Sequence, residues 1–117
     1  MSTIGIDFDG VIHAYSKGWH DGTIYDQPIP GALVALRNLM TEHAVFIFTS
    51  RNVTHVAAWM AERGFTVQAE YNGKFWNKRS TLLITNRKIP ASVYLDDRGV
   101  RFTGDWEEAT NEIKKLI

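Results

Sequence analysis

Two pairs of aspartates are the residues in this sequence most suited to shared chemistry. Asp7 and Asp9 stand one residue apart after an apolar run, and Asp96 and Asp97 follow another. Four acids brought into one small crevice would repel one another unless a cation compensated their charge. Mg²⁺ prefers oxygen ligands and usually retains waters and a substrate phosphate. If the fold brings the pairs together, the sequence predicts a magnesium site.

Groups elsewhere in the chain narrow the chemistry of such a site. Thr49 and Ser50 close an apolar run and would offer a hydroxyl and backbone N–H groups to phosphate oxygens. A lysine would complete the charge balance, and we choose Lys88 over Lys74 and Lys78. An aspartate nucleophile, a second acid, a hydroxyl, a lysine and Mg²⁺ together are typical of phosphoryl transfer through an aspartyl-phosphate.

The elements that must position these groups alternate along the chain. Short runs rich in β-branched and aromatic residues predict four strands, at residues 3–8, 44–49, 65–71 and 91–97. Apolar residues at helical spacing predict three helices, at residues 30–43, 52–64 and 105–117. Apolar strands alternating with helices indicate a three-layer, Rossmann-like α/β domain with a mainly parallel sheet. In such sheets ligands bind at the carboxyl ends of the strands, where all the polar groups above would meet.

Residues of known preference mark the helix ends. Pro30 suits the first turn of the first helix, Asn52 and Asp105 are N-cap residues, and Gly64 is placed to end the second helix. Asp105 is followed three residues later by Glu108, which is a variant of the capping box. Each helix therefore has at least one local signal for its bounds.

Two segments do not fit the alternation. Residues 11–27 contain two glycines among aromatic residues, and we expect a flap or irregular hairpin there. Residues 72–90 begin with Asn-Gly and contain TLLIT, which is strand-like rather than helical. The structure of this second segment stays open at this stage.

Length and composition limit the classes of function. A chain of 117 residues forms one domain, residues 1–117, with a single core. Thirteen basic and thirteen acidic residues give zero net charge, without a basic block for general nucleic-acid binding. The absence of cysteine excludes disulfides and thiolate metal sites. No apolar run approaches a membrane span, so a soluble, cytoplasmic protein without membrane contact is expected.

Four short motifs, in order, resemble those of a known family. DFDGVI, VFIFTSR, NRK and VYLDDR are similar to the four motifs of the haloacid dehalogenase superfamily of phosphohydrolases. The resemblance runs from residue 4 to about residue 105, and the first and last motifs are specific in combination. It implies the same three-layer fold and a Mg²⁺-dependent phosphatase that forms a covalent aspartyl-phosphate.

The resemblance also implies roles for individual residues. Asp7 matches the nucleophile, Asp9 the general acid and base, Thr49 the phosphate-binding hydroxyl and Lys88 the lysine that neutralises nucleophile and phosphate. The implied metal ligands are Asp7, the backbone carbonyl of Asp9, Asp96 directly and Asp97 through water. Gly10 fits the tight turn after the first strand.

The chain resembles the members of this family that lack a cap domain. Its flap spans only residues 11–27, and such members have open sites that often act on macromolecular phosphates. We expect Ser50, Arg51, Gly10 and His13 to contribute to substrate binding. The substrate would be a phosphorylated small molecule or a macromolecular phosphate end, and the oligomeric state is left open.

Two other functions compete with the phosphatase. A metal-dependent nuclease of the acidic-cluster kind would use the aspartates without needing Thr49 or Lys88. A receiver-like or phosphate-binding module would hold phosphate at Asp7 without turnover, although receiver domains place their acid pair after the first strand rather than the last.

Overall fold

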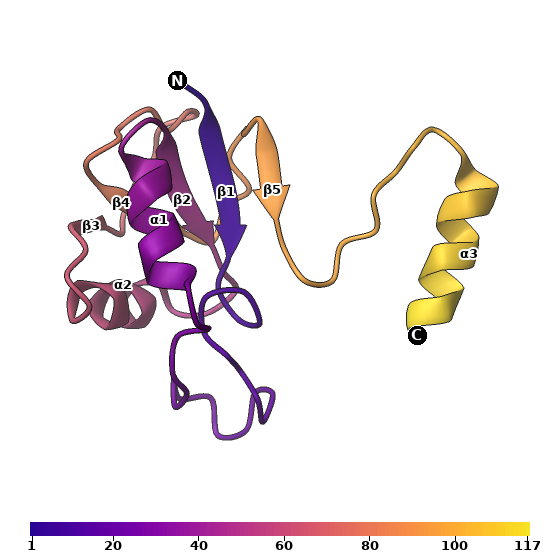
Figure 1. The fold of residues 1–117 in the computed structure, drawn as a ribbon, viewed down its shortest axis with the longest axis horizontal. Helices are drawn as coiled ribbons and strands as arrows, with labels where there is room; N and C mark the ends of the chain where they lie inside the picture. The colour runs from indigo at the N-terminus through magenta and orange to yellow at the C-terminus, as the bar shows by residue number, and fades with distance from the viewer.

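The structure is a computed structural model that describes all of residues 1–117. Its centre is one sheet of five parallel strands in the order β3-β4-β2-β1-β5 (Figure 1). The strands are β1 (Thr3–Asp7), β2 (Ala44–Phe48), β3 (Val67–Gln68), β4 (Leu82–Thr85) and β5 (Val93–Leu95). The helices are α1 (Ala32–Met40), α2 (Val53–Ala61) and α3 (Trp106–Leu116). The predicted α/β class with a parallel sheet is confirmed.

The register of the strands decides which residues meet at the edge of the sheet. β1 lies between β2 and β5, with Asp7 opposite Phe48 and Ile6 opposite Leu95. Because all strands are parallel, their carboxyl ends point to the same edge, where the flap also lies (Figure 1). The residues after β1, β2, β4 and β5 are thereby brought together.

Alternating side chains of the strands pack into two separate apolar layers. On one face, Val45 and Ile47 belong to a cluster that also includes residues of α1 and α2. On the other face, Ala44 and Phe46 pack with Trp76, which is 1% exposed and belongs to no helix or strand. The sheet is therefore the middle of three layers, with two helices on one side and an irregular segment on the other.

Most element predictions agree with the structure, with differences at particular residues. The stretch 65–71, predicted as a strand, pairs only at Val67–Gln68, and the open segment 72–90 supplies the interior strand β4. Asn52 and Asp105 are N-caps as predicted. Pro30 precedes α1, whose N-cap is Gly31, and is therefore not in the first turn as predicted.

The second residue of the expected capping box behaves differently from the prediction. The Glu108 carboxylate accepts a hydrogen bond from Thr103 Oγ1 at 3.0 Å, while the Asp105 side chain alone caps the first turn of α3. The start of α3 is thus held by residues on both sides of its N-cap.

The flap predicted at residues 11–27 is a closed loop. Its two ends are joined by a bridge between His13 and Pro28 and by a hydrogen bond from Ala14 N–H to the Gln27 carbonyl at 3.0 Å. Inside it, Ser16 donates backbone and hydroxyl hydrogen bonds to Asp26, which lower the pKa of Asp26 to about 2. Asp26 is therefore ionised at neutral pH and stabilises the loop.

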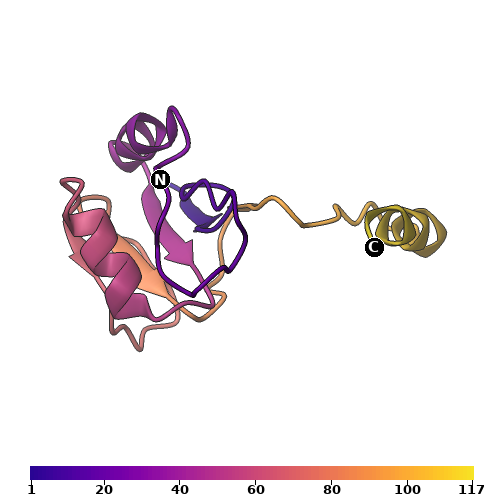
Figure 2. The same ribbon diagram turned by 90° about the horizontal axis from the view of Figure 1, so that it is seen from below.

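α3 lies apart from the rest of the molecule. It contacts no other helix or strand, and an extended connection separates it from β5 (Figures 1 and 2). The Cα radius of gyration is 15.0 Å, whereas a compact chain of this length would have roughly 13.4 Å. None of the three helices combines the length and the apolar character that crossing a membrane requires.

Candidate functional site

Two adjoining cavities open at the carboxyl edge of the sheet and share Asp7. The smaller, of about 150 Å³, is lined by Asp7, Asp9, Tyr15, Thr49, Ser50 and Arg98. The larger, of about 350 Å³, extends along β5 and is lined in part by Asp7, Lys88, Tyr94, Asp96 and Arg98. The structure therefore brings the residues predicted as nucleophile, second acid, hydroxyl and lysine to one edge.

Asp7 sits at the end of β1 among other acids. Partial burial raises the pKa of Asp7 above its ordinary value, and the nearby carboxylates of Asp97, Asp96 and Asp9 raise it further. A hydrogen bond from the backbone N–H of Phe8 to Asp7 Oδ1, at 2.8 Å, acts in the opposite direction. The raised pKa means that the folded chain disfavours a negative charge at Asp7 unless a cation is nearby.

The acids around Asp7 have the chemistry of a cation site. None of Asp7, Asp96 and Asp97 forms an ion pair with a basic side chain. The backbone carbonyl of Asp9 accepts no hydrogen bond, which leaves it available as a ligand. Asp96 Oδ1 accepts backbone hydrogen bonds from Arg98 and Gly99, so that only Oδ2 is free.

The acidic side chains do not form a complete metal site as they lie. As they lie, no three His, Asp or Glu side chains converge on one point as metal ligands. Asp96 and Asp97 are exposed, and reorientation of Asp96 would break its hydrogen bonds with the backbone of Arg98 and Gly99. The donor set thus fits a divalent cation with oxygen ligands, and binding one would require these carboxylates to reorient.

Gly10 allows the first and last motifs to approach each other. Its backbone has φ 81°, and a Cβ at this position would overlap the Asp97 carboxylate. Positive φ and close contact both favour glycine here. Gly10 is thus a packing requirement of the acid cluster, which supports the predicted turn, and its contribution to substrate binding stays a prediction.

Asp9 is held on both of its carboxylate oxygens. Oδ1 lies 2.8 Å from Nδ1 of His13, and Oδ2 lies 2.8 Å from Nε of Arg51. The His13 side chain is 0% exposed and that of Arg51 is 3% exposed. Buried, charge-assisted hydrogen bonds of this length are strong and fix the orientation of the carboxylate.

His13 does not contact the substrate site, contrary to the sequence-based prediction. Its ring is completely buried, and Nε2 accepts a hydrogen bond from the backbone N–H of Asp26 at 3.0 Å. Because Nε2 is an acceptor, the proton of the neutral ring is on Nδ1, where it is donated to Asp9. His13 therefore links the flap to Asp9 and is a positioning residue.

Arg51 is also more deeply placed than expected for a substrate-binding residue. Besides its contact with Asp9, Nη1 donates to the Gly22 carbonyl at 2.9 Å, and the guanidinium lies over the rings of Trp19 and Tyr15. Nη2 is buried and has no hydrogen-bond partner. Arg51 lines neither of the two cavities, so the structure shows it as a residue that holds Asp9, and its predicted contact with a substrate anion stays a prediction.

The loop after β2 presents Thr49 and Ser50 to the smaller cavity. Thr49 is buried, and its Oγ1 accepts a hydrogen bond from the backbone N–H of Arg51 at 3.1 Å, which leaves the hydroxyl proton free to be donated. The Asn86 side chain donates to the carbonyls of Thr49 and Arg51. Ser50 is exposed at the mouth of the cavity.

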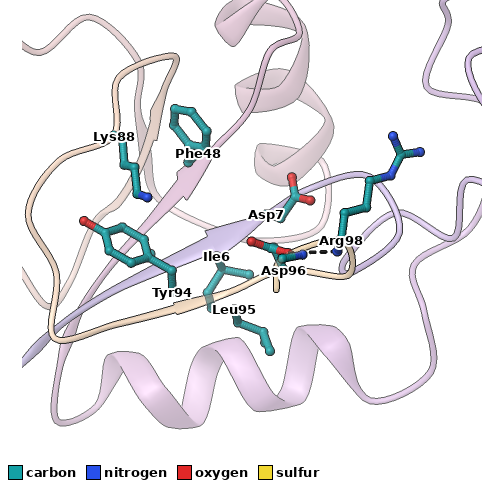
Figure 3. Close-up of a pocket in the computed structure, with 10 residues that line it drawn as sticks. Ile6, Asp7, Phe48, Lys88, Tyr94, Leu95, Asp96 and Arg98 are labelled. Carbon is teal, nitrogen blue, oxygen red and sulfur yellow. Dashed lines mark hydrogen bonds between the residues drawn. The ribbon is translucent and has the colours of Figure 1, made fainter. Parts of the chain in front are cut away.

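Lys88 enters the larger cavity from the side opposite Asp7 (Figure 3). Its Nζ lies 4.7 Å from the centre of the Tyr94 ring rather than at a carboxylate. Lys78 lies over the ring of Trp76, and neither it nor Lys74 lines this cavity. Of the three lysines considered, Lys88 is thus the one placed near Asp7.

Two residues at this edge carry roles that the sequence did not reveal. Asn86 immediately precedes the RK of the third motif, and its amide holds the loop after β2 in place. Asp26, at the far end of the flap, supplies the N–H that fixes the tautomer of His13. The Asn-Arg-Lys motif gave a signal for Asn86, whereas the contact of Asp26 depends on flap geometry that no local pattern encodes.

Comparison with known proteins gives evidence on the fold. No family model matches the chain, and no curated protein matches it. A conserved protein from Bacteroides thetaiotaomicron has a similar structure, with 24% sequence identity, a TM-score of 0.57, and coverage of 97% of this chain and 90% of that one. At this identity the similarity shows a shared fold alone.

Proposed function

We propose that the chain is a Mg²⁺-dependent phosphohydrolase that acts through a covalent aspartyl-phosphate at Asp7. One observation carries the proposal: Asp7 lines both a cavity with Asp9 and Thr49 and a cavity with Lys88 and Asp96. The order of the four motifs, which resembles that of the haloacid dehalogenase superfamily, supports the same reaction. The substrate would be a phosphate monoester on a small molecule or on the end of a macromolecule.

In the first step of the proposed reaction, a carboxylate oxygen of Asp7 attacks the phosphorus atom. The bond between phosphorus and the ester oxygen breaks, and the leaving oxygen takes a proton from Asp9. Thr49 would donate its free hydroxyl proton to a phosphoryl oxygen, and Lys88 would balance the charge on the phosphoryl group. The products are the free alcohol and phosphorylated Asp7.

In the second step, Asp9 accepts a proton from a water molecule that attacks the phosphorus atom. The bond to Asp7 breaks, phosphate leaves, and both aspartates return to their starting states. The contacts of Asp9 with His13 and Arg51 suit this base role directly, because both are donors to a carboxylate. Donating a proton in the first step requires Asp9 to give up one of these contacts.

Mg²⁺ would be held by Asp7, the backbone carbonyl of Asp9 and Asp96, with Asp97 in contact through water. When bound, Mg²⁺ stabilises the charge on the phosphoryl oxygens and keeps Asp7 ionised. The absence of ion pairs at Asp7, Asp96 and Asp97 supports this assignment.

The first test is hydrolysis of an aryl phosphate with Mg²⁺ by the intact chain and by Asp7→Asn. The variant should lose activity by about 10³-fold or more, because an amide oxygen is a poor nucleophile for phosphorus. Asp21→Asn is the matched control, since Asp21 is an exposed flap residue whose contacts are with Thr23. Full activity of a folded Asp7→Asn protein would refute the aspartyl-phosphate.

A second comparison tests which lysine serves the phosphate. Lys88→Ala should lower kcat/KM by about 10²-fold, since a cation in a cavity with the reacting group stabilises the transition state. Lys78→Ala should change it little, because Lys78 packs on Trp76. The opposite ranking would move the role to Lys78 and require another path for residues 72–90.

Two further measurements separate the competing functions. Cleavage of circular single-stranded DNA under the same conditions would identify a nuclease, because a phosphatase requires a terminal monoester. Incubation with acetyl phosphate distinguishes a receiver-like module, in which phosphorylated Asp7 would persist for many minutes. Rapid release of inorganic phosphate with no nicking of the circle is the result expected from a phosphatase.

A further inference from the structure

The face of the sheet that carries α1 has an uncovered apolar groove beside β5. The groove is lined by eight residues, all of them apolar: Ile6, Val11, Ile12, Ala32, Ala35, Leu36, Leu39 and Leu95. Val93 and Leu95 on β5 are 53% and 54% exposed. Both α1 and α2 pack on this face, and neither reaches over β5. No helix of this layer therefore covers β5.

The same chain carries a helix with an unpartnered apolar face. Trp106, Ala109, Ile113 and Leu116 recur at helical spacing along α3, and three of the four side chains are 42–73% exposed. Helices of this length are marginal in water without a partner surface. α3 therefore lacks a partner surface for its apolar face, and the groove lacks a helix that covers it.

The connection between them directs α3 away from its own groove. Phe102 packs against Trp106 with ring centres 5.2 Å apart, and Thr103 is bound to Glu108. These contacts make the end of the connection and the start of α3 one local unit, which extends from the sheet (Figures 1 and 2). Docking on the same chain would require the connection to turn back toward the sheet (Figures 1 and 2).

We propose that two copies of this chain exchange α3, each helix filling the groove beside β5 of the other copy. The arrangement has twofold symmetry, because every chain carries one helix and one groove. It covers Leu95 and Val93 of one copy with Ile113 and Leu116 of the other. This proposal does not depend on the proposed reaction, since no residue of the groove or of α3 has a role in it, although Leu95 also lines the larger cavity.

Light scattering after size-exclusion chromatography at about 100 µM protein tests the proposal, because a contact of this kind should be populated at that concentration. The mass expected is twice the chain mass of 13.3 kDa.

Ile113→Asp places a charge on the apolar face of α3, and Ala35→Asp places one on the exposed lip of the groove. Each should weaken dimerisation about 100-fold, because the charge would be buried without a partner.

Asn111→Asp is the control, since Asn111 is exposed on the opposite side of α3 and should leave the dimer unchanged. Mixing Ile113→Asp with Ala35→Asp chains should restore a weaker mixed dimer, in which one intact helix meets one intact groove. If Ile113→Asp is poorly folded by circular dichroism, Ile113→Ala replaces it. A wild-type monomer, including one with α3 folded back on its own groove, would overturn the proposal, as would a dimer that both charged variants leave intact.

Discussion

Asp9 receives hydrogen bonds from two buried side chains, whereas Asp96 and Asp97, on the other side of Asp7, lie on an exposed segment and form no ion pair. Arg51 links Asp9 to the loop after β2, and His13 links Asp9 to the flap. The β5 side is held by turn hydrogen bonds around Asp96. Asp9 is thus fixed by buried side chains, whereas Asp96 is held only by backbone hydrogen bonds of an exposed turn.

This difference suits the two tasks in the proposed function, which are proton transfer by Asp9 and Mg²⁺ binding with the help of Asp96 and Asp97. A carboxylate that accepts a proton from water benefits from a fixed orientation, which buried donors supply, while its acid role in the first step requires one of these contacts to break. Carboxylates that bind Mg²⁺ repel one another without it, so close packing of all of them in the free protein would be unfavourable. The structure places the two groups after neighbouring strands, Asp9 after β1 and Asp96 and Asp97 after β5.

Among the substitutions that test the difference between the two sides, the replacement of Arg51 should change the free energy of unfolding most. Arg51→Leu deletes the buried partner of Asp9 and the contacts with Trp19 and Tyr15, and should lower the free energy of unfolding by about 3 kcal/mol. Arg98→Leu, on the exposed side, should change it by less than about 0.5 kcal/mol. Urea unfolding of both variants measures the difference, and equal effects would remove the distinction between the two sides.

Gly10 joins the two sides, so a side chain there should affect both. Gly18→Ala isolates the cost of positive φ, since Gly18 has φ 65° and nothing within 4 Å of an added Cβ. That cost is about 1 kcal/mol. Gly10→Ala should cost about 1 kcal/mol more, because it also displaces Asp97. Calorimetric titration with Mg²⁺ should show weakened binding for Gly10→Ala alone.

The smallest effect expected is a gain of stability in Asp7→Asn without metal. The pKa of Asp7 is raised above 3.8 in the folded chain. The folded chain therefore keeps a proton that the unfolded chain loses, and the free energy of unfolding falls as pH rises through that window. The asparagine side chain does not titrate, so the variant should melt at a higher temperature at about pH 7 in EDTA, with the advantage lost at about pH 3. A lower melting temperature at neutral pH would contradict the raised pKa.

Local patterns were sufficient for most of the fold. The apolar runs at β1 and β2, and the caps at Asn52 and Asp105, can be read from neighbouring residues because the interactions are themselves local. β4 was harder to predict, because residues 82–85 become an interior strand only through their pairing with β2 and β3.

The sequence predicted the edge of the sheet at which the candidate site lies, but not the side chains that hold Asp9. Parallel strands place Asp7, Thr49 and Asp96 at the same edge of the sheet, whatever the loops do. Which groups hold Asp9 depends on the closed path of the flap, which brings Asp26 back to His13 over thirteen residues. Likewise, the apolar face of α3 predicts that the helix requires a partner surface, but no pattern within one chain says on which copy that surface lies.

The connection to α3 begins at the two acids that would bind Mg²⁺. Anchoring α3 on a second copy would fix the far end of that connection and restrict the movement of Asp96 and Asp97. If the chain is the proposed phosphohydrolase, its specific activity at limiting Mg²⁺ would then rise with protein concentration.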